Sequence, residues 1–158
     1  MTAHIDTQRW KTDFFDIFNE TFEKVNGIYL DKGTSLFETL ATVSAEEASR
    51  PIARECASIA AQVNHVRYYL EVLCAYTRGQ PPASLDWPGS WQQVTTVSPA
   101  EWDAQRQQLY DTYQQTRALF ENLEDWNAED QVGGALAIVV HTAYHLGEIR
   151  QGLGVLRG

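Results

Sequence analysis

The stretch His141-Thr-Ala-Tyr-His145-Leu-Gly-Glu-Ile-Arg-Gln151 lies inside an apolar segment that is typical of a helix. Its two histidines stand four residues apart, so a helix places both imidazoles on one face, one turn apart. Zinc enzymes with a helical His-x-x-x-His pair bind their metal in this way. Because two ligands rarely suffice, we expect a third from another helix, and His65 lies in a second strongly helical segment. The sequence therefore predicts a fold that brings His65 to His141 and His145.

Composition limits the partners of the chain. Its 158 residues are close to the commonest size of one domain, so we expect a single domain over residues 1–158. The formal net charge of -9 makes nucleic acid and anionic membranes unfavourable partners. We find no secretory signal and no apolar stretch near the roughly 20 residues that span a bilayer. We therefore expect a cytoplasmic protein, with Cys56 and Cys74 on one helix as buried free thiols.

Apolar residues recur at helical spacing in four long segments. The first predicted helix runs from Thr7 to Leu30, and the second runs from about Pro51 to Arg78. The third opens with the capping box Ser98-Pro-Ala-Glu101. The fourth opens at Asn127 and contains the run 132–147, which is apolar nearly all round and predicts a helix surrounded by others.

The connection between the second and third predicted helices, residues 80–97, is longer than usual between antiparallel neighbours. It predicts a crossover along the bundle to a parallel neighbour, and we expect its tryptophans to pin it to the helices. Helix or capping signals also mark two shorter segments, residues 35–40 and 44–47. The predicted fold is all-α: a four-helix bundle of up-down-down-up topology with a long crossover between helices 2 and 3.

The residues around the histidines argue against several familiar metal centres. A His-Glu-x-x-His protease needs Glu directly after the first histidine, where this chain has Thr142. A di-iron carboxylate bundle needs Glu-x-x-His motifs, but Gln62 stands three residues before His65. Structural zinc sites usually include cysteine, and Cys56 and Cys74 are each more than two helical turns from His65. Three imidazoles with an open fourth position fit a catalytic site best.

The segment Asn64-His65-Val-Arg-Tyr-Tyr69, with His-x-x-x-His-x-Gly-x-Ile-Arg-Gln over residues 141–151, resembles the DinB-like superfamily. This is the damage-inducible, YfiT-like group of bacterial proteins, and the likeness extends to chain length, helix order and the long second connection. The resemblance implies an up-down-down-up bundle with His65, His141 and His145 as ligands of a divalent ion, usually zinc or nickel. Characterised relatives include transferases that use the thiols bacillithiol or mycothiol, a thiol-dependent isomerase and metal-dependent hydrolases.

Two further residues belong to the predicted site. Relatives often carry Gln where this chain has Glu148, seven residues after His141 and on the same helical face. We expect Glu148 to act as general base or to orient a ligand, and the alternative is a solvated glutamate. Tyr69, one turn from His65, is a candidate for positioning substrate, with simple packing as its alternative. The leading hypothesis is a metal-dependent hydrolase or thiol S-transferase that acts on a small molecule, with a low-molecular-weight thiol as a candidate cofactor.

Two other hypotheses stay open on the sequence alone. The first is a metal-binding module without turnover, active in a stress response or in protein interaction. It is compatible with a homodimer, because two-fold pairing is the commonest assembly. The second is a helical bundle whose histidines are structural, which predicts no bound metal. His4 lies in the N-terminal segment, and we assign it no role.

Overall fold

A computed structural model describes residues 5–54 and 56–158, which form seven α-helices and no β-strand. The helices are α1 (Thr7–Phe22), α2 (Leu36–Leu40), α3 (Ala45–Ser49), α4 (Ile59–Thr77), α5 (Trp87–Gln92), α6 (Pro99–Glu121) and α7 (Gln131–Arg157). The all-α class is confirmed, and three short helices join the four long ones that the sequence predicts. None of the helices in the described part of the chain is long and apolar enough to cross a membrane. His4 lies outside the described residues.

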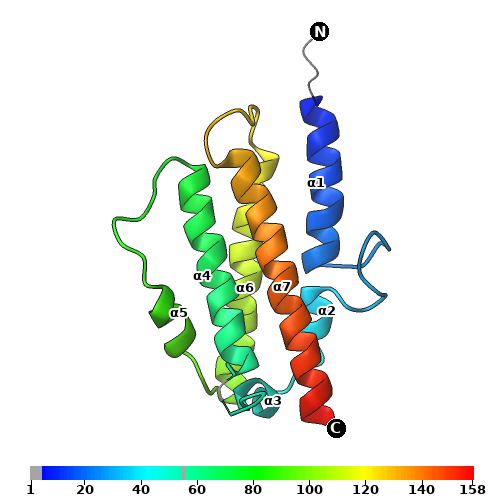
Figure 1. Ribbon diagram of the computed structural model, residues 1–158, viewed down its shortest axis with the longest axis vertical. Coiled ribbons are helices and arrows are strands. Elements are labelled where there is room, and N and C mark those ends of the chain that lie inside the picture. Colours follow the sequence, from blue (N-terminus) through cyan, green and yellow to red (C-terminus); the bar gives the residue numbers. More distant parts are fainter. Residues whose placement is uncertain (1–4, 55) are drawn as a thin grey trace.

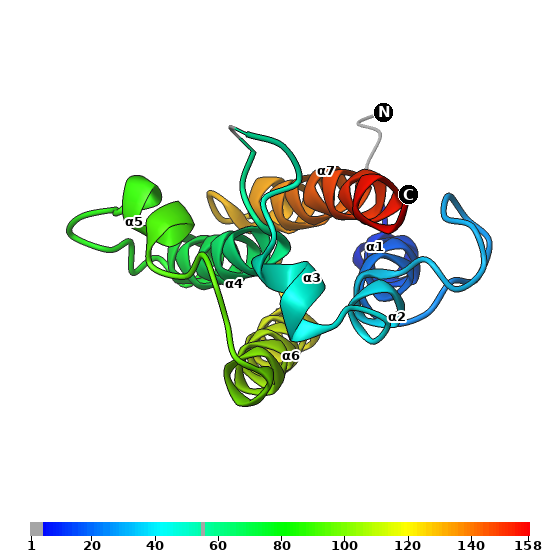
Figure 2. The same cartoon turned by 90° about the horizontal axis from the view of Figure 1, so that it is seen from below.

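The long helices α1, α4, α6 and α7 lie side by side along the molecule (Figure 1). The colours of Figure 1 show α4 and α6 running in one direction and α1 and α7 in the other. Seen from below, α3 lies across one end of the bundle and α5 flanks the outer side of α4 (Figure 2). Because α4 packs against α5, α6 and α7, it is the central helix of the fold.

Aromatic side chains form much of the core between α1 and α6. Phe18 and Phe22, one turn apart on α1, pack on Tyr113 of α6 with ring centroids 5.2 and 4.9 Å apart. Phe120 stacks on Trp126 at 5.6 Å, beyond the end of α6. These rings are almost fully buried, which confirms the apolar face predicted for the first helix.

The first helix ends at Phe22 rather than at the predicted Leu30. The chain then forms an irregular loop, residues 24–34, in which Gly27 and Gly33 have φ angles of 87° and 78°. Such left-handed conformations interrupt a helix and favour glycine. The loop folds back over α1 because the buried Glu20 carboxylate accepts hydrogen bonds from its backbone N–H groups.

The second long helix begins at Ile59 rather than at Pro51. Ser58 is its N-cap, and the Ser58 side chain accepts a hydrogen bond from the backbone N–H of Ala61. The predicted capping box over residues 44–47 is present and opens the short helix α3. The described residues between α3 and α4 therefore belong to a separate segment that joins the two helices.

This boundary changes the interpretation of the two cysteines. Cys56 precedes α4 and is exposed, whereas Cys74 lies within α4 and is buried. The prediction that they share one helix as buried thiols is therefore wrong for Cys56. Both are free thiols, as expected.

The crossover and the last helix also differ from expectation. Residues 80–97 contain the helix α5, so the connection is only partly irregular. The third long helix opens with the predicted capping box, but α7 begins at Gln131 rather than at Asn127, after Asp130 at a φ of 64°. Other helices do not surround α7, because Val140 and Tyr144 remain 66% and 63% exposed.

Candidate metal centre

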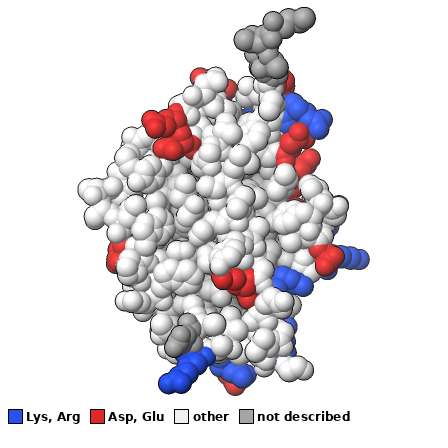
Figure 3. All heavy atoms as spheres, in the orientation of Figure 1, with Lys and Arg blue, Asp and Glu red and all other residues white. Residues whose placement is uncertain are grey.

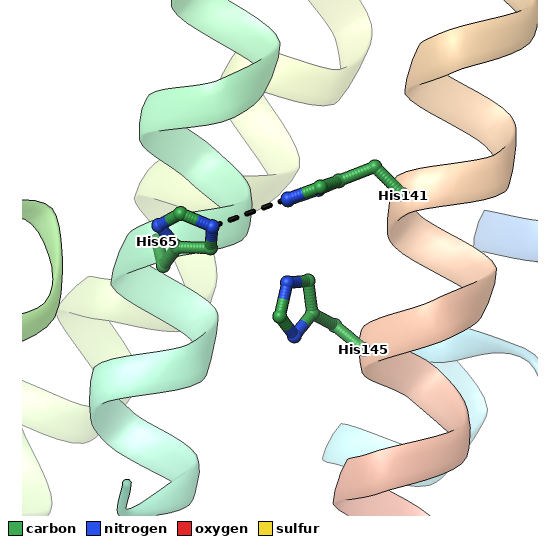
Figure 4. Close-up of side chains that lie close together, drawn as sticks. All are labelled: His65, His141 and His145. Atoms are coloured by element: carbon green, nitrogen blue, oxygen red, sulfur yellow. Dashed lines mark hydrogen bonds between the residues drawn. The ribbon is translucent and has the colours of Figure 1, made fainter. Parts of the chain in front are cut away.

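Three histidines converge in the space between α4 and α7. His65 projects from α4, and His141 and His145 project toward it from successive turns of α7 (Figure 4). One ring nitrogen of each lies within 4.8 Å of the other two, and the Nε2 atoms of His65 and His141 are 3.1 Å apart. The expectation that the fold brings these three residues together is confirmed.

A neighbouring hydroxyl fixes the tautomer of His65. The Nδ1 of His65 lies 2.8 Å from Ser90 Oγ, and that hydroxyl donates its hydrogen to the Trp87 carbonyl at 2.7 Å. A hydroxyl has one hydrogen, so Ser90 accepts from His65 Nδ1–H. The Nε2 atom of His65 therefore carries a lone pair, and it faces the other histidines. Sequence reasoning missed Ser90, because it lies in the crossover and no motif marks it.

The Glu148 carboxylate fixes the tautomer of His145. The Nδ1 of His145 lies 2.9 Å from Glu148 Oε2, one turn further along α7. Because a carboxylate accepts hydrogen bonds, the proton of the neutral ring is on Nδ1 and its lone pair is on Nε2. Metal-ligating histidines almost always donate their other N–H to a carboxylate, a carbonyl or water. The structure thus places Glu148 where it orients His145.

Aromatic rings hold the imidazoles from the sides. Tyr69 stacks on His141 with centroids 3.5 Å apart and planes 5° from parallel. Trp91 of α5 stacks on His65 at 4.0 Å, so the crossover tryptophan is held against α4 as expected. The Tyr69 ring therefore supports a histidine by packing. His141 Nδ1 is buried and has no hydrogen-bond partner.

Burial keeps all three histidines neutral at pH 7. It lowers the pKa of His65 to about 4, with a smaller contribution from His145. Burial, followed by the charges of His145 and His65, lowers the pKa of His141 to about 3. Burial also lowers the pKa of His145, against the opposing effect of Glu148. Neutral imidazole is the form that binds a metal ion.

The residues fit a divalent ion better than a purely structural role. A buried polar atom without a partner, such as His141 Nδ1, costs about 1–3 kcal/mol. His65 and His145 direct lone pairs into one small space, which a shared cation would stabilise. Zinc and nickel both suit imidazole ligands. In the part of the chain that the structure describes, this is the one group of three or more His, Cys, Asp or Glu side chains close enough to hold a metal ion.

Fold and site together define an all-helical protein with a largely buried three-histidine cluster suited to a divalent metal ion. A family profile described as the DinB superfamily matches residues 30–149, a range that contains His65, His141 and His145. The chain belongs to the DinB superfamily. No curated protein and no solved structure gives a significant match.

Proposed function

We propose that this protein is a metal-dependent enzyme in which His65, His141 and His145 bind one zinc or nickel ion. The observation that carries the proposal is the convergence of three ring nitrogens within 4.8 Å of one another. The proposal takes α1, α4, α6 and α7 as the up-down-down-up bundle of the superfamily, with α2, α3 and α5 as additions. It places the protein in the cytoplasm, where free thiols stay reduced.

The reaction that best suits the site is hydrolysis of an electrophilic small molecule, or transfer of a low-molecular-weight thiol to it. A divalent ion supplies Lewis acidity, which lowers the pKa of water or of a thiol toward neutrality. Three protein ligands leave a position open, as in catalytic zinc sites. Ser90 and Glu148 accept the Nδ1–H groups of His65 and His145, respectively. Trp91 covers one face of the His65 ring, and Tyr69 covers one face of the His141 ring.

Elemental analysis of protein purified without an affinity tag or chelator tests the metal site. We expect about one zinc or nickel ion per chain and its loss in His145→Ala, because two imidazoles rarely hold an ion tightly. Arg150→Ala, an exposed change on the same helix, should retain the metal. Tight metal binding that survives in His145→Ala would contradict the site.

Turnover is tested separately from binding. Metal-loaded protein should hydrolyse a model ester, or transfer a thiol to a model electrophile, faster than the apo protein. The His145→Ala variant should match the apo protein. Equal rates for the loaded and apo forms would favour a metal-binding module without turnover.

A second candidate function, an interaction module that forms a homodimer, rests on one surface. The exposed apolar stripe of α7, Leu136, Val140 and Tyr144, has one residue on each of three successive turns. Few charged atoms lie over the middle of α4 and α7 on this face (Figure 3). The chain has a net charge of -9, so two copies would pair most easily through a surface that brings few like charges into contact, such as this stripe. Sedimentation should then show a dimer that Val140→Asp dissociates, and a monomer at all concentrations would reject this candidate.

A further inference from the structure

A cavity of about 500 Å³ lies beside the histidine cluster. This volume is within the range of about 300–1,000 Å³ typical of small-molecule sites. Its walls come from the segment before α4, from α4, from α5 and from the last turns of α7, and include Ile52, Cys56, Gln62, Trp91, Glu148 and Val155. The Ile52 side chain packs directly on Gly152 of α7, and both residues line the cavity.

The cavity shares residues with the candidate metal centre. Trp91 forms a wall and stacks on His65 at 4.0 Å. Glu148 forms another and bonds His145 Nδ1 at 2.9 Å. A molecule in this space would therefore contact side chains that themselves contact two of the three histidines.

The chemistry of the walls limits what the cavity can hold. Isoleucine, valine, alanine and tryptophan side chains contribute much of the lining, and no Lys or Arg is among its described residues. An anionic ligand would lose its hydration and find Glu148, of like charge, as the one charged side chain among the described walls. That carboxylate accepts a hydrogen bond from His145 Nδ1 and its side chain is 41% exposed, so solvent screens its attraction for a cation in the cavity.

One polar group in the cavity has no partner. The Gln62 side chain lines it and is only 4% exposed, yet its Oε1 accepts no hydrogen bond. Buried amides are normally paired, so the unpaired amide of a residue that lines the cavity is the group that we expect a ligand there to pair with. Gln62 lies three residues before His65, so such a ligand group would be held one helical turn from the metal centre.

We propose that this cavity binds the substrate, and that the substrate is an uncharged, largely apolar small molecule with one hydrogen-bonding group for the Gln62 amide. The inference deepens the proposed function and rests on it for the reaction. An acidic low-molecular-weight thiol would bring a carboxylate into a space without a basic residue among its described walls. Within the proposed function, the cavity therefore favours water over such a thiol as the nucleophile.

Cys56 supplies a direct test, because its exposed thiol lies at the cavity wall. The measurement is the rate of Cys56 alkylation by iodoacetamide, followed by mass spectrometry, with benzyl alcohol, benzoate or benzylamine present. Salt at about 1 M reduces the Debye length to about 3 Å, so that the net charge of the protein does not decide the result. Cys74 is an internal reference, since it is buried and burial raises the pKa of its thiol.

Benzyl alcohol should protect Cys56 at concentrations about tenfold lower than benzoate or benzylamine, because a buried charge without a partner is costly. Val155→Trp, which fills the cavity from α7, should abolish protection. Ile17→Trp, a matched change of an exposed β-branched residue on α1, should not. Gln62→Leu should weaken protection by benzyl alcohol about tenfold and leave protection by toluene unchanged.

Protection by benzoate or benzylamine equal to that by benzyl alcohol would overturn the inference, as would full protection in Val155→Trp. Metal content, measured on the same samples, separates this inference from the proposed function. If the protein binds metal but no ligand protects Cys56, the proposal about the cavity is rejected and the metal site stands. If a ligand protects Cys56 but the protein binds no metal, the proposed metal-dependent enzyme is rejected and the ligand-binding cavity stands.

Discussion

Two buried polar sites lie in this bundle, and their hydrogen bonds differ. The Glu20 carboxylate of α1 is fully buried and accepts hydrogen bonds of 2.7–2.9 Å from the backbone N–H groups of residues 26, 28, 29 and 30. The histidine cluster is also largely buried, but His141 Nδ1 has no partner and the Nε2 atoms of His65 and His141 face each other. The chain completes the first site by itself, whereas the second is incomplete without a ligand.

The comparison teaches how to distinguish a structural polar group from a functional one. Burial is similar at both sites, so burial alone does not separate them. The pKa shifts reflect the partners: burial alone would raise the pKa of Glu20, but four backbone N–H groups outweigh it and lower the pKa to about 2. At His141, burial and the neighbouring histidines lower the pKa to about 3, which favours the neutral ligand form.

The largest effect on stability should come from Glu20→Gln. The amide replaces one acceptor oxygen with a donor that opposes the backbone N–H groups, so we expect a loss of about 3 kcal/mol in unfolding free energy. For a chain of this size, that corresponds to a fall in Tm on the order of 10 °C. Urea unfolding measures the change, with the exposed Asp16→Asn on the same helix as control. Equal stability of the two variants would show that the loop does not depend on this carboxylate.

Low pH should remove the contribution of the Glu20 carboxylate to the free energy of unfolding. Glu20 has a pKa of about 2 in the folded chain against an ordinary value of 4.5, so the unfolded chain binds the proton more tightly. The contribution of Glu20 is therefore complete above about pH 4.5 and is lost as the pH falls through about 2. The difference in stability between the wild type and Glu20→Gln should shrink between about pH 5 and pH 3. A difference that stays constant over this range would contradict the assignment.

Ser90→Ala should weaken metal binding without unfolding the protein. Removing the acceptor of His65 Nδ1–H frees the ring to rotate and to change tautomer. The loss of such an outer partner typically costs 10–100-fold in metal affinity. Competition with a chromophoric chelator measures this affinity, and Ser90→Thr, which keeps the hydroxyl, is the control. Unchanged affinity in Ser90→Ala would mean that Ser90 does not position His65.

The smallest effect on stability is expected for His141→Phe. The phenyl ring keeps the stacking on Tyr69 and removes the unpaired Nδ1 atom. The variant also loses the hydrogen bond between the Nε2 atoms of His141 and His65, so we expect the two effects to cancel within about 1 kcal/mol of unfolding free energy in the metal-free protein, while the metal site is lost. Thermal unfolding of both apo proteins measures the difference. Destabilisation by more than about 2 kcal/mol would instead identify the contact between His65 and His141 as structural.

The sequence predicted the parts of the site that depend on helical periodicity. Four-residue spacing placed His141 and His145 together, and His65 was the expected third ligand because it lies in a second strongly helical segment. The resemblance to DinB-like proteins implied the same three ligands. Periodicity could not show where a helix ends: the apolar pattern of the first helix continues to Tyr29, but the bonds of Glu20 turn the backbone into a loop.

Helical periodicity also could not predict the contacts that irregular segments make. Ser90 reaches His65 across 25 residues of sequence, through a crossover whose conformation no periodicity encodes. The second helix was predicted to begin at about Pro51, before its N-cap at Ser58, and this error hid the exposure of Cys56. Both the Ser90 contact and the exposure of Cys56 were missed because loops and helix caps, rather than apolar helix faces, position these residues.

The contact between His65 and His141 joins residues 76 positions apart in the sequence. It closes a loop that contains α5 and all of α6, so the two imidazoles meet only after α7 has docked against α4. A chain that has just been synthesised, or one that has partly unfolded, presents these ligands separately. Metal uptake would therefore report the completed fold, and an ion bound across this loop would act as a reversible cross-link between two distant parts of the chain.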